Sequence, residues 1–124
     1  MVRRGGKALI QKFVYVTFQK EFIHCYPQAP EEVGYLRYPH RHMAHIKVEV
    51  EVFDDDREIE FIMLKHKLER EISLDTITSC SCETIATKIF TFMQHEYSMS
   101  RDMRITVSED GENGSVLVYK KREV

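Results

Sequence analysis

The fold is decided by one stretch of the chain, IKVEVEV at residues 46–52. Its even positions are aliphatic and its odd positions are charged, so the pattern has a period of two residues. Successive side chains of a β-strand point to opposite faces. The even side chains are therefore expected in a core, and the odd ones, Lys47, Glu49 and Glu51, in water.

Upstream of this strand the sequence predicts a second strand and a long loop. Residues 13–24 begin with FVYVTF, a β-branched and aromatic run that suits a pleated surface. Residues 25–39 then contain all three prolines of the chain. A connection of this length inside a small domain suggests a functional loop.

Downstream, after the acidic turn at residues 54–56, two stretches change to a helical period. The first covers residues 59–72, and the second runs from about Cys82 to Glu96 with Ser81 as a plausible N-cap. The expected buried stripes are Phe61, Leu64, Leu68 and Ile72 in the first helix, and Ile85, Ile89, Phe92 and Met93 in the second.

Two further strands complete the chain. Residues 103–108 alternate again, and residues 116–120 return as the last strand after turn chemistry at Asp110-Gly111 and Asn113-Gly114. The order ββααββ predicts an α+β domain in which two helices cover one face of a four-stranded antiparallel sheet. We expect one domain over residues 1–124, with residues 1–11 a flexible or loosely attached N-terminus.

Composition excludes several classes of protein. The formal net charge of −2 gives no global case for nucleic acid, and no run approaches the roughly 18 to 20 apolar residues that cross a membrane. No signal peptide is expected, since the first apolar run begins at Ala8 and is broken by Gln11 and Lys12. A disulfide framework is not expected either, since the three cysteines are an odd number. These features favour a cytoplasmic protein.

The histidines separate by parity. His40 and His42 share the even parity of the buried strand face, and His24 shares the parity of Phe18 and Phe22 on the strand before it. Three converging imidazoles would form an open zinc site with one position left for water or substrate. The alternative is that these are only hydrogen-bonded loop residues. His66 and His95 are expected to be solvated.

Two acidic residues are further candidates. Glu109 shares parity with the apolar positions of the third strand, so a carboxylate ends that face. Such a carboxylate could accept two N–H bonds from a guanidine-like edge of a ligand, unless Glu109 lies in water at a frayed strand end. Glu83 is either a favourable acid in the first turn of a helix or a ligand contact.

Five motifs, in order along residues 13–120, carry a family resemblance. They are FQKEFIH (18–24), HRH (40–42), IEFIMLK (59–65), CSCETIA (80–86) and VSE (107–109). Together they resemble the 6-pyruvoyl-tetrahydropterin synthase family and its bacterial relative, 6-carboxy-tetrahydropterin synthase of queuosine biosynthesis. The resemblance implies the T-fold, zinc at His24, His40 and His42, and a pterin ring anchored by Glu109. It also implies a homo-oligomer, either a trimeric ring or a hexamer of two stacked rings, with sites between subunits.

The departures from that family concern proton transfer. Leu36 stands where the resemblance places a cysteine, and Thr76 follows Asp75 where the family has a histidine. Asp75 therefore remains the candidate catalytic residue, with Cys25, Cys80 and Cys82 as other replacements. Arg41 stands in place of a glycine, and its cation would favour an anionic ligand.

Three functions stay open on this evidence. The first is a zinc-dependent pterin-type synthase or lyase with a reduced set of catalytic residues. The second is a non-catalytic T-fold protein that binds a pterin, a purine or a nucleotide. The third is a purely structural oligomer, which the inward polar residues make less attractive.

Overall fold

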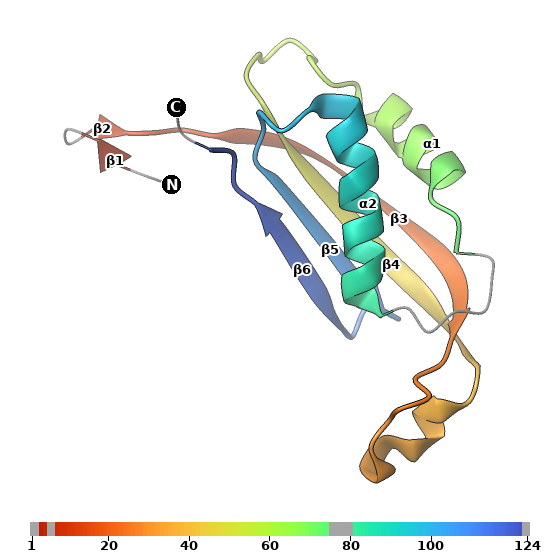
Figure 1. Cartoon of the computed structure of the whole chain (residues 1–124). Coiled ribbons are helices and arrows are strands. Elements are labelled where there is room, and N and C mark those ends of the chain that lie inside the picture. The colour runs from red at the N-terminus through yellow and green to blue at the C-terminus, as the bar shows by residue number, and fades with distance from the viewer. Residues whose placement is uncertain (1–2, 5–6, 75–80, 123–124) are drawn as a thin grey trace.

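The computed structural model describes residues 3–4, 7–74 and 81–122, and it confirms the predicted α+β architecture. The sheet has the strand order β3-β4-β5-β6 with antiparallel neighbours, and helices α1 and α2 cover one of its faces (Figure 1). The strands of this sheet are β3 (Lys12–His24), β4 (His40–Val52), β5 (Met103–Glu109) and β6 (Asn113–Tyr119). The helices are α1 (Phe61–Glu71) and α2 (Cys82–Tyr97), and a short hairpin, β1 (Arg3–Arg4) with β2 (Lys7–Ala8), precedes the sheet.

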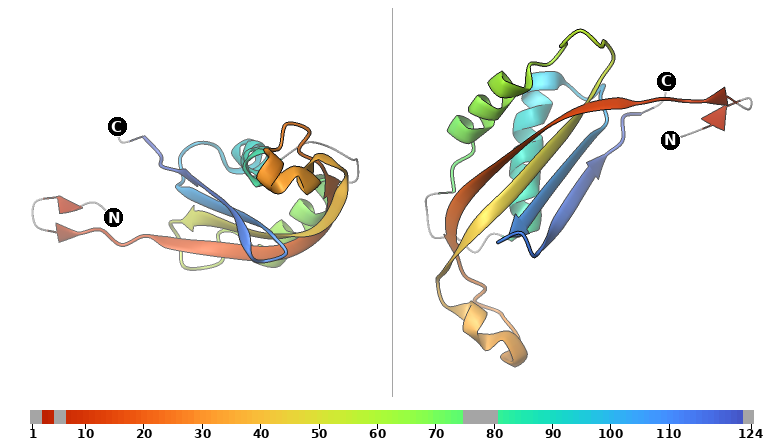
Figure 2. Two further views of the ribbon diagram at one scale, coloured as in Figure 1. Left: turned by 90° about the horizontal axis from the view of Figure 1, so that it is seen from below. Right: turned by 180° about the vertical axis from the view of Figure 1, so that it is seen from behind.

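The core lies between the sheet and the two helices, as the alternation predicts. Even residues of β3 and β4 and odd residues of β5 point toward the helices, and most of them are buried. Among the residues that the structure describes, no helix covers the opposite face, as the view from behind shows (Figure 2). The largest fully buried side chains are Phe22, Ile46, Val48, Val50, Leu64, Leu68, Ile85, Ile89, Met93, Met103, Ile105 and Val107.

Both helices begin at a side-chain cap. Ser81 accepts a hydrogen bond from the backbone N–H of Thr84 at 3.2 Å, which confirms it as the N-cap of α2. Glu60 does the same for α1 through the N–H of Ile62 at 2.8 Å. The expectation that Phe61 is buried is wrong, because it is the first residue of α1 and remains 50% exposed. No helix of the described residues has the length and hydropathy that a bilayer crossing requires.

The expectation that Glu51 points into water is also wrong. Glu51 is only 3% exposed, because Gln11, Asp102 and Lys121 cover the outer face at that end of β4. Its carboxylate accepts hydrogen bonds from the Gln11 amide, the Asp102 N–H and the Lys121 ammonium at 3.0, 3.0 and 2.8 Å. Burial alone would raise the pKa of Glu51, but these donors outweigh it and hold that pKa below its ordinary value.

A second ion pair lies beside this cluster. Arg101 donates to the Glu58 carboxylate at 2.6 Å, and the backbone N–H groups of Phe53 and Asp54 donate to the same side chain. The Arg101 hydrogen bond, followed by that of Phe53, lowers the pKa of Glu58 to about 2.

The turn between β5 and β6 confirms one of the two predicted turn pairs. Asp110 and Gly111 have φ values of 56° and 76°, and the N–H of Glu112 donates to the Glu109 carbonyl at 3.0 Å. Positive φ at both central residues is what a type I′ hairpin turn requires. The second pair, Asn113-Gly114, is not a turn but the start of β6. Gly114 is needed there because a Cβ would lie 1.9 Å from the Val107 carbonyl oxygen.

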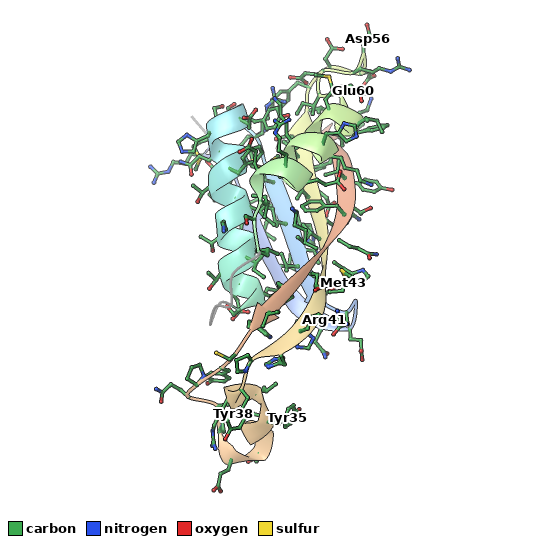
Figure 3. All side chains as sticks on the ribbon, turned by 90° about the vertical axis from the view of Figure 1, so that its right-hand side faces the viewer. Tyr35, Tyr38, Arg41, Met43, Asp56 and Glu60 are labelled. Carbon is green, nitrogen blue, oxygen red and sulfur yellow. The ribbon has the colours of Figure 1, made fainter. Side chains whose placement is uncertain are left out.

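The predicted loop at residues 25–39 forms an arm beyond the end of the sheet (Figures 1 and 3). It contains a 3₁₀ helix, η1 (Glu31–Arg37), and it is braced internally. The N–H of Tyr26 donates to the Leu36 carbonyl at 2.7 Å, and Arg37 Nε donates to the carbonyl of buried Ala29 at 2.9 Å. The arm therefore has a defined conformation.

Candidate metal centre

The predicted histidines meet where the sheet narrows to two strands. The β4–β5 ladder ends at the pair of Ala44 with Glu109, whereas the β3–β4 ladder continues to the pair of His24 with His40. His42 lies two residues before Ala44, on the same face. The inner-face positions of three strands thus converge at this end of the sheet.

The convergence is close enough for shared coordination. One ligand atom each from His24, His40, His42 and Glu109 lies within 4.8 Å of the others. The three imidazole centroids are 4.5, 4.8 and 5.1 Å apart and the rings meet edge to face. This cluster could hold a metal ion.

Two of the imidazoles are held by hydrogen bonds on the side away from the cluster. His40 Nδ1 lies 2.7 Å from the Tyr38 carbonyl oxygen, and His42 Nδ1 lies 2.6 Å from Asp110 Oδ2. A carbonyl or carboxylate oxygen only accepts, so each Nδ1 carries the proton. Each Nε2 then has a lone pair, which is the form of imidazole that binds metals.

The lone pairs face one another and a carboxylate. Within the described part of the chain, the Nε2 atoms of His40 and His42 are buried and make no hydrogen bond. Glu109 Oε2 is 2.8 Å from His42 Nε2 and 3.2 Å from His24 Nε2. Glu109 Oε2 and the unprotonated His42 Nε2 are both acceptors, and they repel one another at this distance unless a cation lies between them, so the donor set fits a divalent metal with nitrogen and oxygen ligands.

A pocket of about 520 Å³ opens beside the cluster. It contains Glu83, whose carboxylate accepts a hydrogen bond from Ser115 Oγ at 2.8 Å. Glu83 and Glu109 are therefore brought to one pocket with two of the histidines. The pocket is lined by His24, Cys25, Tyr26, Leu36, His40, Ser81, Cys82, Glu83, Glu109, Asn113 and Gly114.

The structure does not bring every predicted site residue to this pocket. Arg41 has odd parity and lies on the opposite face, where its guanidinium is 3.5 Å from the Glu21 carboxylate (Figure 3). It borders a small hollow of about 180 Å³ behind His42. Asp75 and Cys80 lie outside the described residues, and His66 and His95 are exposed, as expected.

Asp110 is a further residue of the site, although the sequence pattern predicts it only as part of a turn. Its carboxylate accepts hydrogen bonds from the Met43 N–H at 2.9 Å and from His42. The hydrogen bond from Met43, and after it the one from His42, hold the pKa of Asp110 below its ordinary value. The available signal was an acid that directly follows the strand-ending Glu109.

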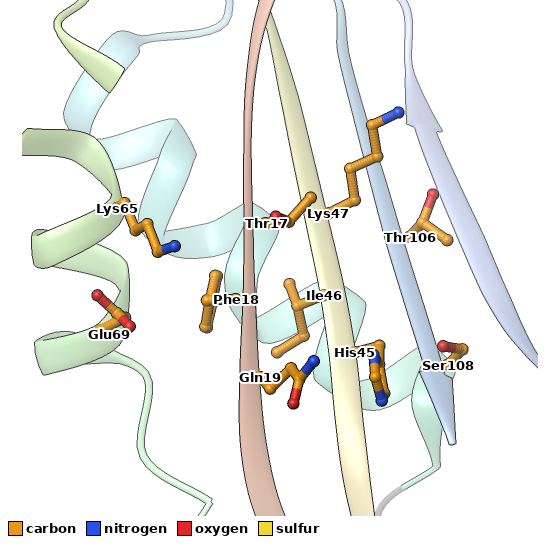
Figure 4. Close-up of a pocket in the computed structure, with 10 residues that line it drawn as sticks. All are labelled: Thr17, Phe18, Gln19, His45, Ile46, Lys47, Lys65, Glu69, Thr106 and Ser108. Carbon is orange, nitrogen blue, oxygen red and sulfur yellow. The ribbon is translucent and has the colours of Figure 1, made fainter. Parts of the chain in front are cut away.

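A second hollow, of about 640 Å³, lies over the outer face of the sheet and reaches the edge of β3 and α1 (Figure 4). It shares no residue with the histidine cluster. Its walls are mainly outward polar side chains such as Gln19, Lys47 and Thr106, as on any sheet face in water. The candidate functional site is therefore the histidine cluster with its adjoining pocket.

Comparison with known proteins does not assign this chain to a family. The sequence matches no protein-family model, and no curated protein is similar enough to it to count as a match.

Proposed function

We propose that this protein binds one Zn²⁺ ion through His24, His40 and His42, and that it binds a pterin or purine-like heterocycle in the adjoining pocket. The observation that carries the proposal is the convergence of three imidazoles, two of which, His40 and His42, already engage Nδ1 in a hydrogen bond outside the cluster. Three histidines with an adjacent open pocket are typical of zinc sites that keep a position for water or ligand.

Glu109 has two possible roles, because it lies in both the cluster and the pocket. It can complete the metal coordination, or it can accept two parallel N–H bonds from a 2-amino-4-oxo ring, as in pterin or guanine. Tyr26 and Leu36 give the pocket apolar surface against which a planar ring can lie. The family resemblance supports the second role.

For a synthase or lyase, bound zinc would polarise an oxygen of the ligand side chain as a Lewis acid. The protein would still have to move a proton. Cys25 and Cys82 line the pocket and are candidates, and Asp75 remains one by resemblance alone. General acid–base groups typically contribute about 10²- to 10⁴-fold each, so we expect weak turnover of ordinary pterin precursors.

A non-catalytic binding protein is the second candidate. The observation in its favour is Leu36, which lines the pocket with an apolar side chain where the resemblance places the proton-transferring cysteine. Turnover of dihydroneopterin triphosphate at rates like those of the family would exclude this candidate. Ligand binding without turnover would support it.

The test of metal binding is elemental analysis of protein purified without chelator, with about one zinc per chain expected. His40→Ala should lose the metal, whereas His66→Ala, which removes an exposed histidine of α1, should keep it. Equal metal content in the two variants would contradict the proposal.

The test of ligand binding is calorimetry with a panel of pterins and purine nucleotides. A Glu109 that anchors the ring predicts a preference for 2-amino-4-oxo rings over adenine, and Glu109→Gln should lose about 2 to 5 kcal/mol of binding. The same affinity for adenine would remove Glu109 from that role.

We also propose a homo-oligomer joined through sheet edges. Among the described strands, β3 and β6 each pair with a neighbour on one side only, and proteins seldom leave such edges uncovered. The resemblance favours either a trimeric ring or a hexamer of two stacked rings. Sedimentation that shows a monomer at micromolar concentration would contradict this.

A further inference from the structure

Asp110 is fixed to strand β4 by three hydrogen bonds. Its backbone N–H donates to the Met43 carbonyl at 2.7 Å, and Met43 N–H donates back to Asp110 Oδ1 at 2.9 Å. The second carboxylate oxygen, Oδ2, lies 2.6 Å from His42 Nδ1. One oxygen is therefore anchored by the backbone, and the other is aimed at the imidazole.

The backbone around Asp110 holds this arrangement at some conformational cost. Asp110 has a φ of 56°, in the left-handed region that only Gly, Asn and Asp adopt readily. The turn hydrogen bond from the Glu112 N–H to the Glu109 carbonyl keeps it there. The turn thus delivers a carboxylate to the outer side of His42 while Glu109, one residue earlier, faces its inner side.

We infer that Asp110 is a positioning residue of the metal site, which fixes His42 as the Nδ1–H tautomer and aims Nε2 at His24, His40 and Glu109. The inference rests on the metal binding proposed above. Tyr38 does the same for His40 through its backbone carbonyl, so the chain uses one side-chain acceptor and one main-chain acceptor for the same purpose. Outer-shell partners of this kind typically contribute about 10- to 100-fold to metal affinity.

The first test is titration of the metal-free protein with Co²⁺, followed by its visible absorption. Asp110→Asn keeps the size of the side chain, and asparagine accepts a positive φ, so the fold should survive. One oxygen cannot serve both Met43 and His42, and we expect Co²⁺ to bind about 10- to 100-fold more weakly. The matched control is Glu112→Gln, which removes the same charge from an exposed side chain of the same turn and should bind as the wild type does.

The second test is the tautomer itself, read from imidazole ¹⁵N shifts in the metal-free protein. In the wild type His42 should be the Nδ1–H form, and in Asp110→Asn it should become a mixture or the Nε2–H form. His40 should stay unchanged in both, because its acceptor is the Tyr38 carbonyl.

The two measurements separate the inference from the proposal on which it rests. No Co²⁺ binding by the wild type would overturn the metal site, and the tautomer would still decide the role of Asp110. Co²⁺ binding that is equal in wild type and Asp110→Asn, or a His42 tautomer that does not respond, would overturn the inference while the metal site stands.

Discussion

Glu109→Gln should raise the stability of the metal-free protein, and, in the role in which the Glu109 carboxylate completes the metal coordination, it should lower that of the metal-bound protein. Without metal, Glu109 Oε2 faces the His42 Nε2 lone pair at 2.8 Å and His24 Nε2 at 3.2 Å. An amide nitrogen in that place donates a hydrogen bond where two acceptors otherwise meet. Such a bond contributes about 0.5 to 1.5 kcal/mol.

The size of both changes can be estimated. For a chain of 124 residues an unfolding entropy of about 2.1 cal/mol/K per residue makes 1 kcal/mol equal to about 4 °C in Tm. The metal-free variant should therefore melt about 2 to 6 °C higher than the wild type. A metal at 100 times its Kd raises the free energy of unfolding of the wild type by about 2.7 kcal/mol. The same metal concentration would raise that of a variant that binds 100-fold more weakly by less than about 0.5 kcal/mol.

The assay is thermal unfolding at about pH 8 with excess chelator and, separately, with Co²⁺ or Zn²⁺. The control is Glu83→Gln, which changes the other carboxylate of the pocket without touching the cluster, since Glu83 is bonded to Ser115. If Glu109→Gln lowers Tm in chelator, the pair of Glu109 and His42 is joined by a proton in the metal-free state and the reasoning fails.

Three further predictions concern the rest of the fold. Glu51→Gln should lower the free energy of unfolding in urea by about 3 kcal/mol, because it leaves buried donors without their charged acceptor. The control, Glu49→Gln on the same strand, should lower it by less than about 1 kcal/mol. Glu58, with its pKa of about 2 against an ordinary 4.5, contributes stability that is complete above pH 4.5 and lost as pH falls toward 2, so Glu58→Gln should flatten the decline of urea midpoints over that interval. Gly114→Ala should lower the free energy of unfolding by more than about 1 kcal/mol, because its Cβ would meet a backbone oxygen at 1.9 Å. Gly34→Ala is the control, since its Cβ would meet only an arginine side chain at 3.4 Å. Equal unfolding midpoints of the two variants would contradict the prediction.

The part of the site that lies on strands could be predicted from the sequence. Parity places His40 and His42 on the inner face because β4 runs without a bulge from His40 to Val52. The same rule works for His24 and Glu109, which end regular strands. A period of two is a local property, so it carries across a whole strand.

Contacts between distant segments could not be predicted in this way. Parity gives the side of the sheet on which Glu51 lies, but not that Gln11 and Lys121 cover that side. Asp110 reaches His42 across a sequence separation of 68 residues, which no local pattern records. The role of Asp75 stays a prediction, since it lies outside the described residues.

The two-stranded ribbon formed by the ends of β3 and β4, which carries His24 and His40, has a consequence for amide hydrogen exchange and for folding. Beyond Ala44 only β3 and β4 remain paired, and two strands alone are marginal in water. An ion that joins His24 to His40 acts as a removable cross-link around the arm, closing a loop of about 15 residues. By the loop-entropy relation for cross-links, that closure corresponds to about 3 kcal/mol of lost freedom in the unfolded chain. Amide hydrogens of the ribbon and the arm should then exchange with solvent at a rate set by the supply of metal, while those of β5 exchange only with global opening.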